Sequence, residues 1–178
     1  MRVISGRFKG KPLKELKYDH IRPTADKVKQ ALFTKLQFEI EGARVLDLFC
    51  GTGGLGIEAI SRGAREVIFV DKNPKSVALT RENLKNIGSD ARVYNVPFEK
   101  ALEKVEGQFD LILLDPPYNS GFYEKALEMI EKRKLLAEGG TIVCEHYKDD
   151  LFDYSRFDVY DEKTYGTVVL TYLKNKEK

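Results

Sequence analysis

From residue 43 onward, short apolar runs alternate with segments whose apolar residues recur at helical spacing. The apolar runs are typical of buried strands, and the connecting segments are typical of amphipathic helices. Two more apolar runs near the C-terminus are joined by a short link, which predicts that the last strand is antiparallel to its neighbours. Repeated strand–helix units of this kind predict an α/β, Rossmann-like fold with a seven-stranded, mostly parallel sheet. Strands are expected at 44–49, 67–70, 92–96, 109–114, 140–145, 157–160 and 167–173, and helices at 55–61, 74–84, 99–105 and 123–133.

The first forty residues follow a different pattern. Glycine and proline separate short apolar stretches in residues 1–20, and this predicts a β-hairpin. Apolar residues at helical spacing predict a helix within 21–40, with Thr24 as its N-cap. A chain of 178 residues is long enough to bury one core. We therefore expect a single domain at 1–178, in which the hairpin and the leading helix precede a Rossmann-like core at 43–178.

Charge is distributed unevenly along the chain, although the net charge is only +2. Residues 1–35 contain ten lysines and arginines but only three acidic residues, whereas the remainder contains 20 basic and 25 acidic residues. A basic arm on a mildly acidic body favours a polyanionic partner. Charge alone does not separate this interpretation from an ordinary solvated basic surface.

Several functional classes are disfavoured by composition. Apolar runs such as 109–114 are far too short to cross a bilayer, and the N-terminus has no apolar signal-peptide core. We therefore expect a cytoplasmic protein without a membrane partner. Cys50 and Cys144 lie 94 positions apart, and His20 and His146 are isolated, so we expect neither a disulfide framework nor a metal site.

The loop after the first expected strand carries glycines at G-x-G-x-x-G spacing and leads directly into a helix. Glycine allows a close approach of the backbone to a ligand, and the helix start offers free N–H groups. An aspartate after the second strand can accept hydrogen bonds from the hydroxyls of an adenosine ribose. These features indicate a nucleoside-bearing cofactor, but they do not separate a nicotinamide dinucleotide from S-adenosylmethionine. Phe98, after the third strand, either covers the adenine or fills the core. The other residues expected to bind the cofactor are Asp47, Gly51, Thr52, Gly53, Gly56 and Asp71.

A second loop, Asp115-Pro116-Pro117-Tyr118, follows the fourth strand, and open α/β sheets bind ligands at the carboxyl ends of their strands. The two prolines remove two backbone donors and stiffen the chain, which leaves a rigid wall of acceptors beside an aromatic ring. Such a wall matches the exocyclic amine of an unstacked base, because accepting both N–H bonds frees the nitrogen lone pair to attack a methyl group. We interpret these four residues as catalytic. The alternative is a turn that only ends the strand.

At this point the sequence resembles a known family. The loop at 47–56 resembles motif I of methyltransferases, and 115–118 resembles the Asp/Asn-Pro-Pro-Tyr/Phe motif of amino-methyltransferases. The stretches 2–10, 22–28 and 163–167 are similar to those of RsmD-type small-subunit ribosomal RNA guanine-N2 methyltransferases. The resemblance covers nearly the whole chain, and the N-terminal stretches are what point to this family.

The resemblance implies that S-adenosylmethionine is the cofactor and that one guanosine of small-subunit ribosomal RNA is the substrate. The target nucleotide stays open, and so does the choice between free RNA and a small-subunit assembly intermediate. It also implies that Thr24 lies near the methionine end of the cofactor and that the basic N-terminal segment contacts RNA. Glu145, at the end of the fifth strand, is interpreted as structural. The residues expected to bind RNA are Arg7, Lys9, Lys11 and Arg22.

Three alternatives remain open. Adenine-N6 methylation of DNA or RNA uses the same Pro-Pro loop, although these 178 residues contain no separate target-recognition region. A non-catalytic RNA-binding scaffold of the same fold would be expected to have degraded motifs, whereas both loops are intact here. A nicotinamide oxidoreductase has no evident use for the acceptor wall.

Overall fold

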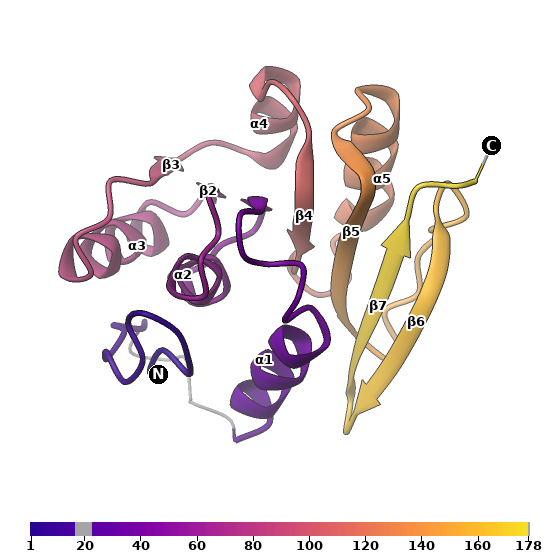
Figure 1. Ribbon diagram of the computed structural model, residues 1–178. Helices are drawn as coiled ribbons and strands as arrows, with labels where there is room; N and C mark the ends of the chain where they lie inside the picture. Colours follow the sequence, from indigo (N-terminus) through magenta and orange to yellow (C-terminus); the bar gives the residue numbers. More distant parts are fainter. Residues whose placement is uncertain (17–22, 178) are drawn as a thin grey trace.

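A single mixed sheet organises the computed structural model, which describes residues 1–16 and 23–177 (Figure 1). The strands are β1 (Arg44–Asp47), β2 (Glu66–Val70), β3 (Arg92–Tyr94), β4 (Phe109–Leu114), β5 (Leu136–Tyr147), β6 (Asp158–Tyr165) and β7 (Val168–Lys174). Their order across the sheet is β3-β2-β1-β4-β5-β7-β6. The first five strands are parallel, and β7 is antiparallel to both β5 and β6. The expected Rossmann-like fold with an antiparallel last strand is therefore confirmed.

Helices cover both faces of the sheet. They are α1 (Pro23–Lys35), α2 (Gly54–Ser61), α3 (Pro74–Asn86), α4 (Phe98–Lys104) and α5 (Phe122–Lys132). Side chains alternate along each strand, so Val45 and Phe69 pack in one apolar core with α1, α2 and α3. Leu46 and Ile68 point the other way and pack in a second core with α4 and α5. This double burial explains why the central strands are almost continuously apolar.

The centre of the sheet contains a topological switch point. β1 pairs in parallel with β2 on one side and with β4 on the other. The chain leaves β1 through α2 toward β2, whereas β4 and its following helix lie on the opposite side. Loops that diverge in this way leave a crevice at the carboxyl ends of the two strands. The loops at 48–53 and 115–121 leave β1 and β4 at this point, so the two motifs singled out in the sequence share one edge of the sheet.

The N-terminal segment pairs with itself as a short, irregular antiparallel hairpin. Arg2 and Pro12 form an antiparallel bridge, and the N–H groups of Val3 and Leu13 donate to the carbonyls of Lys11 and Met1 at 3.0 and 2.8 Å. Residues 17–20 of the expected hairpin lie outside the described part of the chain. The hairpin turn also packs onto α2, where Gly6, with φ of 87°, approaches the end of that helix closely. A Cβ at Gly6 would lie only 2.1 Å from the Ser61 carbonyl oxygen.

A buried carboxylate in α2 fixes the same segment. Glu58 is 0% exposed and accepts the backbone N–H groups of Ile4 and Ser5 at 2.8 and 3.0 Å. Lys29 and Arg62 neutralise its charge at 3.3 and 2.9 Å. The N-terminal segment is therefore held to the core by paired charges and backbone hydrogen bonds rather than by a strand ladder.

Some expected boundaries also differ. α1 begins at Pro23, so Thr24 lies in its first turn and not at the N-cap, since proline is well suited to the first helical position. β5 begins at Leu136, with an irregular register beside β4, and β6 continues to Tyr165 because it pairs with β7 along most of its length. No helix in the described ranges is long and apolar enough to span a membrane.

Candidate active site

Two aspartates hold the glycine loop in place. Asp47, at the end of β1, accepts the Gly56 N–H at 3.0 Å, and Asp71, just after β2, accepts the Gly51 N–H at 2.8 Å. The Thr80 hydroxyl of α3 donates to the Gly51 carbonyl at 2.8 Å. The conformation of the loop is thus set by hydrogen bonds within the protein.

The glycines of this loop serve different purposes. Gly51 has φ of 56°, and a Cβ there would meet no atom within 4 Å, so the bare backbone forms the wall of an open space. Gly53, with φ of 89°, is the N-cap of α2. Gly56 lies inside α2, where a Cβ would come within 2.2 Å of the Phe69 ring, so it permits the helix to pack on β2. Thr52 lies between Gly51 and Gly53, and its carbonyl accepts a hydrogen bond from the Asn83 side chain of α3 at 3.0 Å.

A cavity of about 600 Å³ lies on one side of the glycine loop. Phe98 forms part of its wall and is also packed in the core, with its ring centroid 5.0 Å from that of Phe122. Both interpretations of Phe98 given above are therefore compatible with its position. The predicted residues that line this cavity are Gly51, Asp71, Phe98, Asp115, Pro116 and Pro117.

A second cavity, of about 360 Å³, lies on the other side of the loop and is strongly acidic. Asp47, Asp115 and Glu145 line it together with Lys29. The Lys29 amine pairs with the buried Glu58 at 3.3 Å, and burial lowers the pKa of this lysine. The three cavity carboxylates have no cation within ion-pair distance in the described part of the chain. This half of the cleft is therefore suited to a cationic ligand.

Asp115 lies where these two cavities meet a third one of about 140 Å³. The third cavity is walled by Tyr118, whose side chain is 55% exposed and meets the Tyr147 ring edge-on at 5.5 Å. The Tyr118 hydroxyl donates to Asp149 at 2.9 Å, and this hydrogen bond raises the pKa of the phenol. An aromatic face thus stands beside a carboxylate that is open to both halves of the cleft.

Asp115 and Glu145 form a hydrogen-bonded carboxyl pair. Crowding by protein atoms and then the adjacent Glu145 raise the pKa of Asp115 well above its usual range. Asp115 is exposed to the open cleft, so the neighbouring carboxylate is the main cause of this rise. Burial raises the pKa of Glu145, and burial also raises that of Asp47 to about 7. The carboxyl groups of the cleft therefore hold protons more readily than isolated carboxyl groups do.

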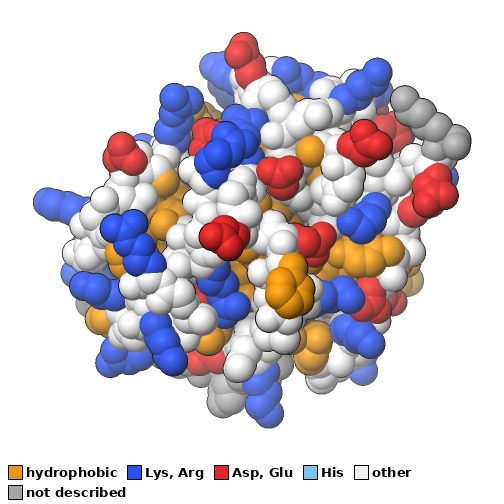
Figure 2. All heavy atoms as spheres, in the orientation of Figure 1, with side chains coloured by type: hydrophobic (Ala, Val, Ile, Leu, Met, Phe, Trp, Pro, Cys, Tyr) orange, Lys and Arg blue, Asp and Glu red, His pale blue; other side chains and the backbone are white. Residues whose placement is uncertain are grey.

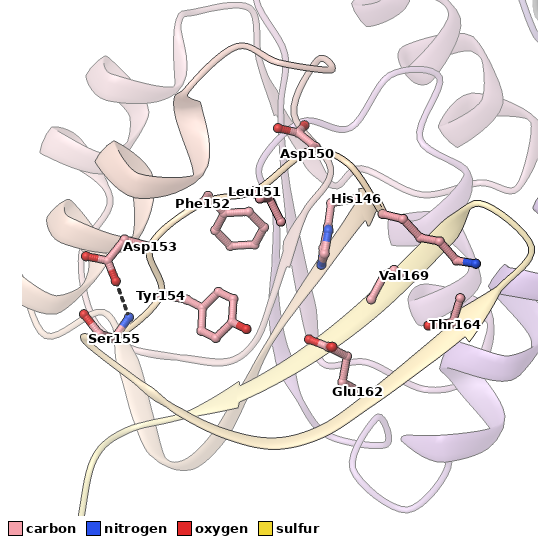
Figure 3. A pocket seen from close by; sticks show the side chains of 11 residues that line it. His146, Asp150, Leu151, Phe152, Asp153, Tyr154, Ser155, Glu162, Thr164 and Val169 are labelled. Carbon is pink, nitrogen blue, oxygen red and sulfur yellow. Dashed lines mark hydrogen bonds between the residues drawn. The ribbon is translucent and has the colours of Figure 1, made fainter.

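A neighbouring hollow of about 470 Å³ lies under the segment at 148–155 (Figure 3). Figure 3 shows the rings of Phe152 and Tyr154 around this hollow, with His146 and Glu162 at its other side. The His146 imidazole contacts the Thr171 hydroxyl at 2.8 Å, and that hydroxyl donates to Glu162 at 2.8 Å. One lysine also lines the hollow, so it is acidic overall and disfavours phosphate. Its carboxylates are Asp150, Asp153 and Glu162.

The predicted RNA-binding residues of the N-terminal segment lie on the surface. Arg7, Lys9 and Lys11 are all exposed, and within the described ranges no carboxylate pairs with them. Figure 2 shows lysine and arginine side chains across the lower left of the molecule, where this segment lies. Met1, at the start of the segment, lines the acidic cavity. The basic segment therefore reaches the rim of the cleft.

Two predicted residues are less fully described. Arg22 lies outside the described residues, and of Thr24 only the position in α1 is known. Ala25 and Val28, in the same helix, line the acidic cavity, so the first turns of α1 border the cleft.

Other reactive side chains have no visible role here. Burial raises the pKa of the Cys50 and Cys144 thiols, which keeps both in the unreactive thiol form. Among the described residues, no cluster of histidine, cysteine, aspartate and glutamate is arranged to hold a metal ion.

Glu145, which the sequence suggests is structural, lines two of the cavities in the cleft. Like two of the predicted site residues, it is acidic and lies near the carboxyl end of a central strand. Asp47 and Asp115 occupy equivalent positions at β1 and β4. Since those ends meet at one edge of the sheet, the same argument applied to Glu145 would have placed it in the cleft.

Residues 1–174 match the family described as conserved hypothetical protein 95. The chain is 44% identical to the Bacillus subtilis protein named "Putative rRNA methyltransferase YlbH", over 84% of each chain. It is 32% identical to ribosomal RNA small subunit methyltransferase D of Haemophilus influenzae, over 98% of this chain and 94% of that protein. The solved structure titled "Putative methyltransferase yhhF from Escherichia coli" matches with a TM-score of 0.88 at 25% identity, over 98% of both chains. The chain belongs to the family of ribosomal RNA small subunit methyltransferase D.

Proposed function

We propose that this protein transfers a methyl group from S-adenosylmethionine to the exocyclic N2 amine of a guanosine in small-subunit ribosomal RNA. As a member of its family it is a methyltransferase that acts on ribosomal RNA. The observation that carries the proposal is the position of Asp115 at the junction of three cavities. A carboxylate there can touch a cofactor in the cleft and a base beside Tyr118 at the same time.

The methyl donor is S-adenosylmethionine, and the residues of the cleft fit it. This cofactor carries a positive sulfonium and a positive amino group, which match the carboxylates of Asp47, Asp115 and Glu145. A nicotinamide dinucleotide would instead bring the negative charges of a pyrophosphate beside the same carboxylates. Asp71 is the residue that would accept the ribose hydroxyls, and the bare backbone at Gly51 would let the nucleoside approach closely.

The chain contributes positioning and electrostatics to the reaction. When bound, S-adenosylmethionine supplies an electrophilic methyl group, whose bond to sulfur breaks as the bond to the amine nitrogen forms. Asp115 accepts one N–H of the amine, and carbonyl oxygens of the Pro-Pro loop accept the other, which directs the lone pair toward the methyl group. Tyr118 stacks on the base. The methylated nitrogen then releases a proton, and Asp115, already its hydrogen-bond partner, can accept it.

Charge supports one direction of approach for the RNA. Arg7, Lys9 and Lys11 are exposed and able to contact phosphates, whereas the hollow under 148–155 is lined mainly by carboxylates. The RNA backbone would therefore lie on the side of the N-terminal segment. Guanine, as opposed to adenine, is supported by the resemblance of that segment to guanine-N2 enzymes.

The proposal is tested by following the methyl group. Ribosomal RNA from cells lacking the gene is incubated with the purified protein and methyl-labelled S-adenosylmethionine, then digested to nucleosides. Label is expected in N2-methylguanosine of small-subunit RNA, and this nucleoside is expected to be reduced in the cells that lack the gene. Label recovered only in N6-methyladenosine would replace the guanine proposal with the adenine one.

A further inference from the structure

Glu145 occupies a position that packing alone does not explain. Its side chain is partly exposed and lines two cavities beside the carboxyl group of Asp115. One is the acidic cavity, and the other is the cavity walled by Tyr118, which we call the base cavity. No lysine or arginine in the described part of the chain lies within ion-pair distance of either carboxylate. Two adjacent carboxylates without a cation destabilise a fold, so such a pair points to a ligand that supplies hydrogen-bond donors.

The backbone around Glu145 is held firmly. Glu145 pairs with Leu170 in the antiparallel ladder between β5 and β7. The Tyr123 hydroxyl, from α5, donates a hydrogen bond to the Glu145 carbonyl. These contacts fix the backbone of Glu145 on a central strand, and its side chain extends from there to the cavities that Asp115 also lines. Its direction is therefore part of the shape of the base cavity.

We propose that Glu145 is a specificity-determining residue that accepts the N1–H of the target guanine while Asp115 accepts the N2 amine. This inference rests on the proposed function and explains how the site would select guanine. The N1–H and N2–H donors of guanine lie side by side on the Watson–Crick edge, and they face two side-by-side acceptors. On binding, these two donors replace the hydrogen bond between the carboxyl groups, and any proton held by the pair is released to solvent.

The same pair would reject adenine. Adenine presents its N6 amine beside N1, which is an acceptor and carries no hydrogen. The Glu145 carboxylate would then face the N1 lone pair, and these two acceptors would have no donor between them. Repulsion of the wrong base contributes to specificity as much as attraction of the right one.

A competing role for Glu145 is to balance the positive charge of the cofactor, because it also lines the acidic cavity. The two roles make different predictions. A charge-balancing residue affects cofactor affinity and is indifferent to the atom at position N1 of the base. A residue that reads N1–H changes the preference between bases that differ only on that edge.

The test compares guanosine with 2-aminopurine riboside at the target nucleotide identified by the labelling experiment. 2-Aminopurine keeps the amine but has an unprotonated N1. Each RNA is prepared free or reconstituted into small subunits, whichever form the wild-type protein methylates, and kcat/KM is measured for both. The wild type should prefer guanine by about 10- to 100-fold, as expected for loss of a hydrogen bond to a charged group.

In Glu145→Gln the amide can donate to N1, so the preference should shrink toward equality or invert. Intrinsic differences between the two bases, and any loss of folded protein, cancel when the preference is compared between variants. Glu138→Gln is the matched control, because Glu138 lies on the same strand but is exposed; it should keep the wild-type preference. An unchanged preference in Glu145→Gln overturns the inference, and a weaker S-adenosylmethionine affinity alongside it would assign the charge-balancing role. Failure of the wild type to methylate guanine would instead overturn the proposed function.

Discussion

The two loops that face each other across the cleft differ in how their polar groups are satisfied. In the glycine loop, Asp47 and Asp71 each accept a backbone N–H, and α3 donates to the loop carbonyls. On the opposite side, Asp115 and Glu145 face each other without a cation in the described chain, and the Tyr118 ring is largely exposed. The polar groups of the glycine loop are satisfied within the protein, whereas the Asp115–Glu145 pair can still accept hydrogen bonds from a ligand.

This difference indicates a division of labour. A loop whose hydrogen bonds are internal can bind its ligand by shape, with little rearrangement. Acceptors that lack donors raise the free energy of the unliganded protein. This free energy is recovered only when a ligand with hydrogen-bond donors binds, and polar sites reject ligands without those donors for this reason. We therefore expect substitutions in the glycine loop to change stability and cofactor binding, and substitutions opposite it to change transfer and base choice.

Replacing Asp115 should give the largest effect on catalysis. Asp115→Ala removes the acceptor that orients the amine, so transfer should fall by about 100- to 1,000-fold or more. Affinity for S-adenosylmethionine, measured by calorimetry, should change only a few-fold because Asp71 and the glycine loop are untouched. Asp110→Ala is the matched control, since Asp110 lies at the other end of the same strand and is exposed. Wild-type turnover in Asp115→Ala, or loss of cofactor binding in step with turnover, would break the division of labour.

The pH dependence of stability tests Asp47, the carboxylate that both supports the glycine loop and lines the acidic cavity. Asp47 supports the glycine loop and also lines the acidic cavity, and burial raises its pKa from 3.8 to about 7. The folded state therefore retains a proton that the unfolded chain loses near pH 4, and the associated stabilisation is lost as pH rises from about 4 through 7. Asp47→Asn can still accept the Gly56 N–H but has no charge to bury.

We expect the unfolding free energy of the wild type to decrease by about 2–3 kcal/mol more than that of Asp47→Asn between pH 5 and pH 8. Urea denaturation at the two pH values measures both. Asp110→Asn, an exposed carboxylate, should follow the wild type. Parallel pH profiles for the wild type and Asp47→Asn would show that Asp47 is ionised in the folded protein throughout this range.

Alanine substitutions at Gly56 and Gly54 compare a tightly packed position with an open one in the same helix, α2. A Cβ at Gly56 would meet the Phe69 ring at 2.2 Å, so Gly56→Ala should lower the unfolding free energy by about 1–3 kcal/mol. A Cβ at Gly54 would meet only the flexible end of Met1, at 2.9 Å. Gly54→Ala should therefore have a much smaller effect in the same thermal or urea denaturation. Equal losses for the two variants would contradict the packing role of Gly56.

The alternation of strands and helices could be predicted from the sequence because the central strands are buried on both faces. A run such as 109–114 is almost wholly apolar for that reason. The conformation of the N-terminal segment could not be predicted in the same way. Its turns are set by contacts with Glu58 and Ser61, more than fifty positions away in the chain, and local propensity carries no information about them.

For a related reason, the two loops of the site could be predicted from the sequence but the position of Glu145 could not. Glycine spacing and the Pro-Pro pair are local signals, so the two loops could be recognised without knowing which strands are neighbours. The role of Glu145 depends on β5 lying next to β4, which brings its carboxylate to Asp115. A lone glutamate at the end of a strand has no such meaning until the strand order is known.

The smallest effect on the chemical step is expected from the basic segment, which lies at the rim of the cleft. Replacing Arg7, Lys9 and Lys11 together with glutamine should weaken RNA binding and reduce the slope of log K against log salt by about 2. Turnover at saturating RNA should be nearly unchanged, because these side chains contact phosphate and not the reacting atoms.

The matched control replaces Lys85, Lys104 and Lys134, which are exposed near the ends of α3, α4 and α5. Helices in this fold run against their strands, so those lysines lie at the edge of the sheet opposite the cleft. A salt slope that falls equally in both triple variants would mean that RNA binds without regard to the cleft. A slope that falls only in the N-terminal variant would fix the side from which the base reaches Asp115.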